Sequence, residues 1–175
     1  MTTKLELVTQ HVRAVPDFPK PGILFRDITP LLGHPEAFAA SIDLLKDAVA
    51  DLRVETIVAI ESRGFLFGAP LALALGCSLV PVRKPGKLPH AKRRVEYALE
   101  YGTDALEMHE DAIRQGARTL IVDDVIATGG TAEAAAELVR QVGGEPVGHA
   151  FFIELAFLEG RKKLAPLPVR AVLTY

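Results

Sequence analysis

The chain has 175 residues, of which 49% are hydrophobic and 24% charged, and its formal net charge is −2. This composition predicts a compact globular protein of one domain and excludes a disordered one, and the overall charge gives no indication of nucleic acid or an anionic membrane as a partner. The single cysteine, Cys77, excludes an internal disulfide, and the first residues lack the apolar core of a signal peptide. We therefore expect a cytoplasmic protein.

The first part of the chain predicts two helices with an irregular segment between them. Apolar residues at helical spacing predict a helix over residues 3–14, which ends before Pro16. Residues 16–22, with the sequence PDFPKPG, are too rich in proline for regular structure. Pro35 suits a first helical turn, and the spacing of apolar residues predicts a second helix over 35–51.

Predicted strands alternate with helices from residue 56 onward. The strands are expected at residues 56–60, 78–83, 95–100, 118–123, 147–154 and 169–174, and the helices at 64–75 and 131–142. This order predicts the α/β class, with a mainly parallel twisted sheet and helices on both faces. Ligands of such sheets bind at the carboxyl ends of the strands, where we expect the loop at 61–63 and Asp123.

Residues 64–82 contain no charged side chain over a length that approaches a membrane span. Gly68, Pro70, Gly76 and Pro81 interrupt this stretch. We therefore predict a buried helix followed by a buried strand, and no segment that spans a membrane.

Residues 120–131, LIVDDVIATGGT, place two carboxylates at the end of a buried strand, followed by a glycine turn that opens a helix. Main-chain N–H groups at a helix N-terminus favour a phosphate, and Gly129 and Gly130 allow an anion to approach closely. Asp123 and Asp124 are acceptors, so their partner beside the phosphate must carry hydroxyl groups or a metal. A glycine pair alone is more often a simple turn, but the whole segment predicts a sugar-phosphate site.

Six of the twelve residues from 83 to 94, RKPGKLPHAKRR, are Lys or Arg. A segment this charged cannot be core, and three interpretations are open. It can be a solvated basic face, or a nucleic-acid patch, although no aromatic residue is interleaved with the charges. With Pro85, Gly86 and Pro89 inside it, the segment fits better as a mobile flap that closes cations over a polyanion.

A second junction between strand and helix has the sequence Glu61-Ser62-Arg63-Gly64. Ser62 is suited to cap the helix, and Arg63 is suited to hold a phosphate through its fork of N–H donors. The five histidines are scattered without metal-ligand spacing, and no triad with Ser or Cys can be assembled from the sequence. We therefore expect no metal that protein side chains hold alone.

Five segments resemble those of one known family and follow in its order: residues 16–32 (PDFPKPGILFRDITPLL), 61–72 (ESRGFLFGAPLA), 82–89 (VRKPGKLP), 99–113 (LEYGTDALEMHEDAI) and 122–131 (VDDVIATGGT). On these segments the chain resembles the adenine phosphoribosyltransferases, within the purine and pyrimidine phosphoribosyltransferases. The resemblance implies a single domain over residues 1–175 with the type I, Rossmann-like fold of that family. It also implies a small N-terminal hood for base recognition over residues 1–34 and a flexible catalytic flap over 83–101.

The resemblance implies transfer of the 5-phosphoribosyl group from 5-phosphoribosyl 1-diphosphate to adenine, which gives AMP and diphosphate in purine salvage. Mg²⁺ would be carried on the diphosphate, and the protein would be a homodimer. Two alternatives stay open: a hypoxanthine or guanine phosphoribosyltransferase, and a regulator that binds phosphoribosyl diphosphate without turnover. The regulator would need an attached DNA-binding element, and none is visible in the sequence.

The site residues that the resemblance implies fall into three groups. The sugar and its 5′-phosphate would be bound by the carboxylates, by Ser62 and by the turn, that is by Asp123, Asp124, Ala127, Thr128, Gly129, Gly130 and Thr131. The diphosphate would be held by Arg63 and the flap residues Arg83, Lys84 and Lys87. The adenine ring would lie between Phe25 and Val125, with its edge read by the backbone of Leu24 and Arg26.

Two further residues take roles from the resemblance. Glu100 would manage the purine proton, as a catalytic residue together with Arg63, and Tyr101 would close the site over phosphoribosyl diphosphate. The chain departs from the family at Val125-Ile126, where Leu-Leu is common, and in the basic run at 90–94. These departures bear on base stacking and on flap closure.

Overall fold

The computed structural model of the protein describes residues 2–99 and 102–175. The chain divides into two compact units, Met1–Leu44 and Leu45–Tyr175. Among the described residues, every helix is too short or too polar to cross a lipid bilayer.

The first unit is built around a β-hairpin that was not predicted. Helix α1, Lys4–Gln10, begins at a capping box in which Thr3 and Glu6 exchange hydrogen bonds, and it ends four residues before the predicted end at 14. The reason is that strand β1, Arg13–Pro16, pairs antiparallel with β2, Leu24–Asp27. Residues 17–22 form neither helix nor strand, as predicted, but Pro16, the first residue of the predicted irregular segment, is the last residue of β1. Helices α2, Thr29–Leu32, and α3, Pro35–Ala48, follow.

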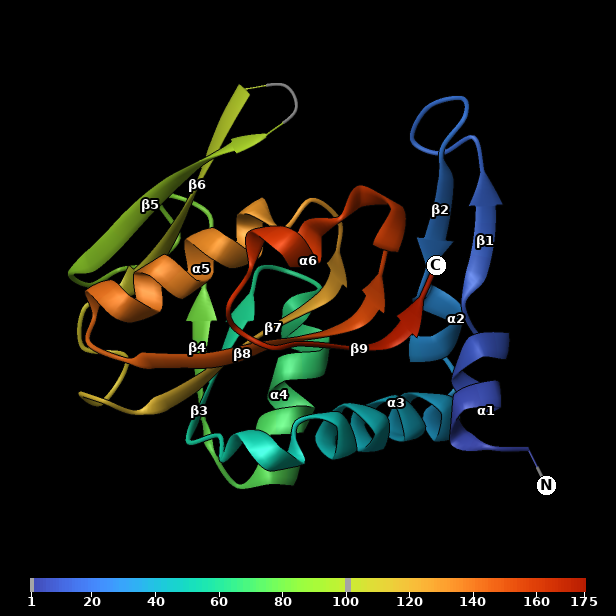
Figure 1. The fold of residues 1–175 in the computed structure, drawn as a ribbon, viewed down its shortest axis with the longest axis horizontal. Helices are drawn as coiled ribbons and strands as arrows, with labels where there is room; N and C mark the ends of the chain where they lie inside the picture. The colour runs from blue at the N-terminus through green and yellow to red at the C-terminus, as the bar shows by residue number, and fades with distance from the viewer. Residues whose placement is uncertain (1, 100–101) are drawn as a thin grey trace. The chain divides into compact units, whose positions relative to one another are not determined.

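The second unit contains a parallel five-stranded sheet with the order β4-β3-β7-β8-β9 (Figure 1). The strands are β3 Thr56–Ile60, β4 Ser78–Val82, β7 Arg118–Ile126, β8 Glu145–Glu154 and β9 Val169–Thr174. Every neighbouring pair is parallel, which confirms the predicted α/β class with a mainly parallel sheet. Strand β7 lies at the centre and runs three residues beyond the predicted end at 123, so Asp123, Asp124 and Val125 lie on the strand itself.

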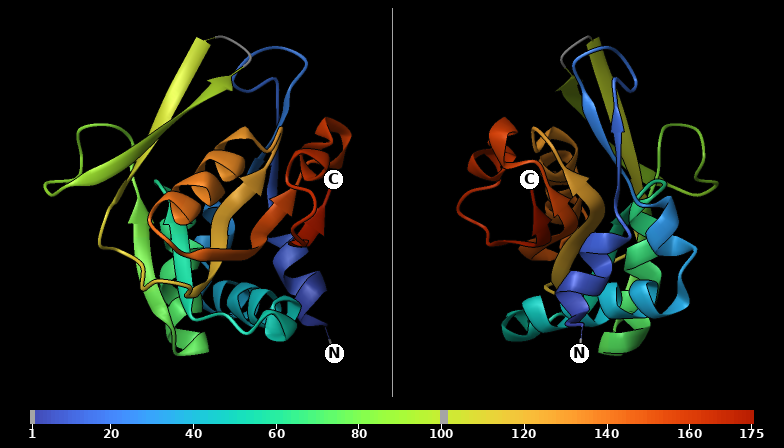
Figure 2. Two further views of the ribbon diagram at one scale, coloured as in Figure 1. Left: turned by 60° about the vertical axis from the view of Figure 1, so that its left-hand side comes forward. Right: turned by 90° about the vertical axis from the view of Figure 1, so that its right-hand side faces the viewer.

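Helices cover both faces of this sheet, as predicted (Figures 1 and 2). Helix α4, Gly64–Leu75, packs against β3 at Gly68, where a Cβ atom would lie only 2.5 Å from the Cβ of Ala59. Helix α5, Gly130–Gln141, packs in one buried cluster with Val58 and Ile60, whose side chains point to the other face because strand side chains alternate. The layers therefore place the starts of α4 and α5 at the carboxyl ends of β3 and β7.

A second antiparallel hairpin, β5 Lys92–Leu99 and β6 Gly102–His109, stands beside α5 (Figure 2). The prediction of a strand at 95–100 found part of β5, but its first residues were assigned to the basic loop and β6 was missed. Leu106 and Met108 of β6 join the core under α5, and the charged residues of β5 remain exposed. The 3-10 helices Ala50–Leu52 and Ala156–Leu158 and the short helix α6, Gly160–Lys163, complete the unit.

Candidate active site

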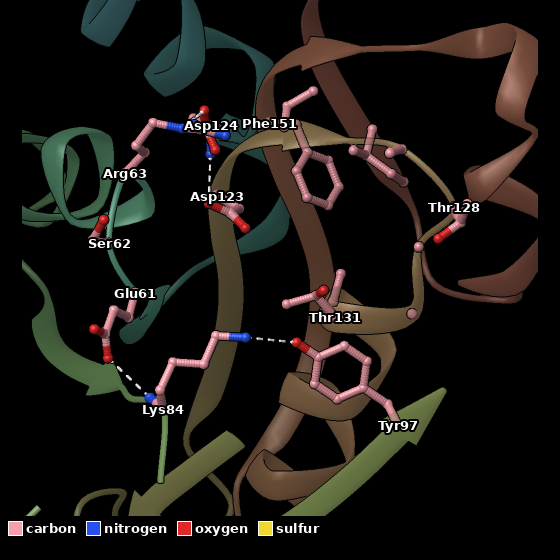
Figure 3. Close-up of a pocket in the computed structure, with 16 residues that line it drawn as sticks. Glu61, Ser62, Arg63, Lys84, Tyr97, Asp123, Asp124, Thr128, Thr131 and Phe151 are labelled. Carbon is pink, nitrogen blue, oxygen red and sulfur yellow. Dashed lines mark hydrogen bonds and ion pairs between the residues drawn. The ribbon is translucent and has the colours of Figure 1, made fainter. Parts of the chain in front are cut away.

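A pocket of about 400 Å³ opens where the carboxyl ends of β3 and β7 meet the start of α5 (Figure 3). Its walls come from the junction after β3, the end of β7, the glycine turn, Lys84, β5 and β8. The lining residues are Glu61, Ser62, Arg63, Lys84, Tyr97, Asp123, Asp124, Val125, Ile126, Ala127, Thr128, Gly129, Gly130, Thr131, Ala132 and Phe151. The position is the one that parallel α/β sheets use for ligands.

The glycine turn presents the N-terminus of α5 to the pocket. Gly129 is the N-cap residue with a φ angle of 84°, in the left-handed region that favours glycine, and no side chain caps the helix there. The N–H groups of the first helical turn are therefore available to an anion, which the helix dipole also favours. Thr128 and Thr131 carry their hydroxyls at the same edge.

The two carboxylates of β7 have different environments. Asp124 is buried and accepts a hydrogen bond of 2.5 Å from Nε of Arg63, so this carboxylate is paired. Burial raises the pKa of Asp123 well above its usual value, and the neighbouring charge of Asp124 raises it further. Gly64 lies so close to Asp123 that a Cβ atom there would stand 2.9 Å from Oδ1, which requires glycine at the start of α4.

Glu61, which the sequence analysis passed over, organises the start of the basic segment. Its carboxylate accepts hydrogen bonds from Arg83 Nε at 3.0 Å, from the backbone N–H of Lys84 at 2.9 Å, and from Lys87 Nζ. Burial acts to raise the pKa of Glu61, but the hydrogen bonds from Lys87, Lys84 and Arg83 outweigh it and lower the pKa to about 2. Arg83 and Lys87 are therefore held beside the pocket, although only Lys84 lines it.

Lys84 meets two residues of the β5–β6 hairpin. Its ammonium donates to the hydroxyl of Tyr97 at 3.1 Å and to a carboxylate oxygen of Asp104 (Figure 3 draws the Tyr97 bond). Burial acts against the charged form, but the hydrogen bonds to Asp104 and Tyr97 and their charges raise the pKa of Lys84. The pocket wall therefore contains a cation that is held in place.

The structure brings most of the predicted ligand residues into one pocket. Those that line it are Ser62, Arg63, Lys84, Asp123, Asp124, Val125, Ala127, Thr128, Gly129, Gly130 and Thr131. Leu24, Phe25 and Arg26 lie on β2 of the first unit. Glu100 and Tyr101 lie outside the described residues.

The pocket also contains residues that the sequence analysis missed. Tyr97 and Glu61 are the polar ones, and Ile126, Ala132 and Phe151 add apolar surface. Glu61 directly follows a predicted buried strand, and this position was a usable signal for it. Phe151 lies within the short apolar run at residues 150–153 of β8, where the sequence contains no sign that one side chain faces a ligand.

A cation site built from protein side chains alone is not found in the described part of the chain, since no group of three or more His, Cys, Asp or Glu residues there could hold a metal ion. The three carboxylates that line the pocket, Glu61, Asp123 and Asp124, are few for a divalent cation, which prefers about six oxygen ligands. A cation at this site would need oxygens from a ligand as well.

Comparison with known proteins identifies the class that this fold and pocket define. The model of the phosphoribosyl transferase domain matches residues 27–167, and the chain therefore belongs to the phosphoribosyltransferase family. Similar proteins within that family include adenine phosphoribosyltransferases. The chain is 60% identical to the adenine phosphoribosyltransferase of Sorangium cellulosum over 161 residues, which is 92% of this chain and 80% of the relative.

Solved structures agree with this assignment. The adenine phosphoribosyltransferase of Thermoanaerobacter pseudethanolicus superimposes with a TM-score of 0.94 at 51% identity and covers 98% of this chain and 99% of its own. That of Saccharomyces cerevisiae, solved with an imino-altritol bisphosphate and adenine, has a TM-score of 0.92 at 44% identity and covers 99% and 100%. These relatives share the whole fold with this chain.

Proposed function

We propose that the protein transfers the 5-phosphoribosyl group from 5-phosphoribosyl 1-diphosphate to adenine, which gives AMP and diphosphate. The observation that carries this proposal is one pocket in which an uncapped glycine turn, three carboxylates and two cations surround a space of about 400 Å³. Relatives that share more than half of the residues of this chain are named adenine phosphoribosyltransferase, which supports adenine as the acceptor. The product AMP makes this a reaction of purine salvage.

The turn and the carboxylates fit the two ends of a ribose 5-phosphate. The N–H groups from Ala127 to Thr131 would bind the 5′-phosphate, and the hydroxyls of Thr128 and Thr131 would add donors. Asp123 and Asp124 would accept hydrogen bonds from the 2′- and 3′-hydroxyls of the ribose. Arg63 pairs with Asp124, so the sugar and the diphosphate would share these two groups with their ion pair.

The cations fit the leaving group. Departure of diphosphate from C1 would leave a ribosyl centre with oxocarbenium character, while negative charge grows on the diphosphate. Lys84 and Arg63 line the pocket, and Ser62 lies between the strand and Arg63. Donors placed before the reaction stabilise developing charge strongly when water is excluded. Arg83 and Lys87, held at Glu61, would add positive potential beside them.

Mg²⁺ is proposed as the cofactor that arrives with the diphosphate. The pocket fits this role, because Asp123 and Asp124 lie next to each other in its wall. Glu61, the third carboxylate among the described lining residues, already accepts hydrogen bonds from Arg83, Lys84 and Lys87. The metal would supply charge neutralisation on the leaving diphosphate.

Adenine recognition is proposed for Leu24, Phe25 and Arg26 of β2 and for Val125 of β7. A neutral purine needs flat apolar walls and backbone groups that match its edge, and these residues are suited to supply both. Glu100 is proposed to manage the purine proton and Tyr101 to close the site. Their roles rest on the resemblance, since both residues lie outside the described part of the chain.

The test is a panel of adenine, hypoxanthine and guanine, each with phosphoribosyl diphosphate and Mg²⁺, in which nucleotide formation is followed. AMP from adenine, with little product from the other two bases, is the expected result. A folded protein that binds phosphoribosyl diphosphate but forms no AMP would support the regulator instead. Removal of Mg²⁺ by a chelator should abolish the reaction.

Three variants test the proposed residues. Asp124→Ala and Arg63→Ala should each lower AMP formation strongly, and unchanged rates would refute the site. Glu100→Ala should lower kcat more than it weakens phosphoribosyl diphosphate binding, whereas the reverse pattern would make Glu100 a binding residue.

We further propose a cytoplasmic homodimer. Leu66 and Leu73 of α4 and Leu79 of the edge strand β4 are exposed, at 41%, 86% and 42%, on the segment that carries no charge. Apolar side chains gathered on one face indicate an interface, and a second copy is the occupant that the resemblance implies. Light scattering should give the mass of a dimer for the wild type and of a monomer for Leu73→Glu. The unpaired Cys77 fits a reducing compartment.

A further inference from the structure

The cation Lys84 is held by two side chains that no resemblance singled out. Tyr97 of β5 and Asp104 of β6 are direct partners in the antiparallel register of the hairpin, so their side chains stand on the same face. Tyr97 accepts a hydrogen bond from the Lys84 ammonium at 3.1 Å, and its own hydroxyl lies 3.3 Å from the Asp104 carboxylate. Asp104 also accepts directly from Lys84. The three groups close a triangle of hydrogen bonds.

Each residue of the triangle makes a further contact that holds it in place. The second oxygen of Asp104 accepts a hydrogen bond of 2.8 Å from the backbone N–H of Ala105, and the backbone N–H of Lys84 donates to Glu61. The Tyr97 ring packs against the core cluster under α5 and lies near Gly130 of the glycine turn, where a Cβ atom would stand 3.7 Å from Cδ2. The hairpin, the cation and the turn therefore meet at Tyr97.

The geometry leaves Lys84 free to bind a ligand without releasing these partners. An ammonium has three N–H donors, and Asp104 and Tyr97 take two of them. Tyr97 and Lys84 line the pocket, whereas Asp104 stands behind them and does not. The remaining donor is suited to an oxygen of an anion in the pocket.

We propose that Tyr97 and Asp104 are positioning residues that hold the Lys84 ammonium in the pocket wall and thereby set the affinity for the diphosphate group of phosphoribosyl diphosphate. This inference rests on the proposed function and adds to it two residues that act through Lys84. A free lysine side chain loses rotamer entropy when it is ordered. Holding Lys84 in place beforehand removes most of that loss from the binding step.

The same arrangement predicts which ligands are affected. Phosphoribosyl diphosphate and free diphosphate carry the group that Lys84 would contact, and AMP lacks it. Loss of the Tyr97 hydroxyl or of the Asp104 charge should therefore weaken the first two ligands and leave AMP unchanged. A general loosening of the pocket would weaken all three.

The experiment compares Tyr97→Phe and Asp104→Asn with the wild type, in the presence of Mg²⁺, by steady-state kinetics and by calorimetry with diphosphate and with AMP. Tyr97→Phe keeps the ring and removes only the hydroxyl. The KM for phosphoribosyl diphosphate should rise about tenfold or more, as expected for one hydrogen bond to a charged group. Glu96→Gln, an exposed neighbour on β5 paired with Arg94, is the matched control and should behave as wild type.

A double-mutant cycle with Lys84→Met decides whether the two residues act through Lys84. In that background, Tyr97→Phe and Asp104→Asn should have no further effect on diphosphate binding. Three results would overturn the inference: an unchanged KM in both single variants, an equal loss of AMP affinity, or an undiminished effect without Lys84. Wild-type protein that forms no AMP would refute the proposed function first and is thus a distinct outcome. Should one variant fail to fold, the other, on the facing strand, gives the same test.

Discussion

The backbone of Gly160 lies directly against that of Gly129. A Cβ atom on Gly129 would stand 2.6 Å from the carbonyl oxygen of Gly160, and one on Gly160 would overlap the carbonyl oxygen of Ala127. Arg161, the next residue, is fixed by a hydrogen bond of 2.9 Å from Nε to Glu154 and by one of 2.7 Å from Nη1 to the carbonyl oxygen of Val169. The start of α6 therefore packs against the backbone of the glycine turn, and the hydrogen bonds of Arg161 hold it there.

Gly160→Ala should displace the glycine turn, because the new methyl group has no space between the two backbones. We expect weaker binding of both phosphoribosyl diphosphate and AMP, by about tenfold or more, since both ligands carry the 5′-phosphate. Calorimetry with each ligand measures this. The contrast with the Lys84 triangle, where AMP should be unaffected, separates the two ends of the pocket.

Gly116→Ala is the matched control for this substitution. Gly116 also requires glycine, with a φ angle of 72°, but nothing lies within 4 Å of its Cβ position. The variant should lose about 1 kcal/mol of stability from backbone strain and keep its ligand affinities. Equal losses of affinity in the two variants would show that destabilisation alone explains the Gly160 result.

Asp123→Asn should stabilise the free protein and impair the reaction. Burial and the charge of Asp124 raise the pKa of Asp123, so the folded state binds this proton more tightly than the unfolded state does. The resulting loss of stability grows as the pH rises from the usual aspartate range near 3.8 through the raised pKa. The asparagine amide carries no charge and so removes this loss of stability. The melting temperature of Asp123→Asn should therefore exceed that of wild type most at neutral and alkaline pH, while kcat/KM falls.

Asp124→Asn should behave in the opposite way, because its carboxylate is paired with Arg63 and the pair would be broken. Melting curves of both variants from pH 5 to 9 make the comparison. If Asp123→Asn lowers the melting temperature throughout this range, burial and the charge of Asp124 do not destabilise the Asp123 carboxylate.

Glu61→Gln should loosen the start of the basic segment. The hydrogen bonds from Lys87, Lys84 and Arg83 overcome burial and lower the pKa of Glu61 to about 2, so its contribution to stability is present above the usual glutamate pKa near 4.5 and lost as the pH falls toward 2. The variant should therefore be less stable than wild type at pH 7 and nearly equal to it near pH 2. Denaturant titrations at both pH values measure the difference.

The same variant should also raise the KM for phosphoribosyl diphosphate, because Lys84 and Lys87 lose the partner that orders them. Glu55→Gln serves as the control, since this exposed carboxylate pairs with Arg114 away from the pocket. An unchanged KM in Glu61→Gln would mean that the cations find their positions without it.

His149 of β8 should make the protein sensitive to acid. The imidazole is buried and stacks on Phe151 with ring centroids 6.3 Å apart, and burial lowers its pKa from 6.5 to about 4. The unfolded state takes up the proton below pH 6.5 and the folded state only below about 4. Stability should therefore fall by up to roughly 3 kcal/mol as the pH decreases through this window. His149→Phe should flatten that decline, and an identical slope in the two proteins would contradict it.

Local patterns were sufficient for the elements that hold the pocket. Strand β3 and helix α4 coincide with the predictions at 56–60 and 64–75, because an unbroken apolar run and a glycine at each end of the helix are local signals. The glycine turn and its two carboxylates were also predicted, since a phosphate site at a helix N-terminus needs only consecutive residues. The basic segment was identified by composition alone.

The missed strands are those whose stability depends on a partner. Strand β6 has the sequence GTDALEMH, in which polar and apolar residues lack a clear period, and it is a strand because it pairs with β5 and packs Leu106 and Met108 under α5. Strands β1 and β2 likewise form because they pair with each other. This pairing begins at Arg13, so the helix that was predicted over residues 3–14 ends earlier. No local pattern contains that information.

The sequence by itself determined the α/β class, the glycine turn at the start of a helix, the two adjacent carboxylates and, through five family-like segments, the family. Only the tertiary structure decided how the charges are paired: Arg63 with Asp124, Glu61 with Arg83 and Lys87, and Lys84 with Tyr97 and Asp104. These partners are 13 to 61 residues apart in the chain. Short-range periodicity reports which face of an element is buried, whereas a pairing across the sheet depends on strand order and register, which arise only when the whole unit folds.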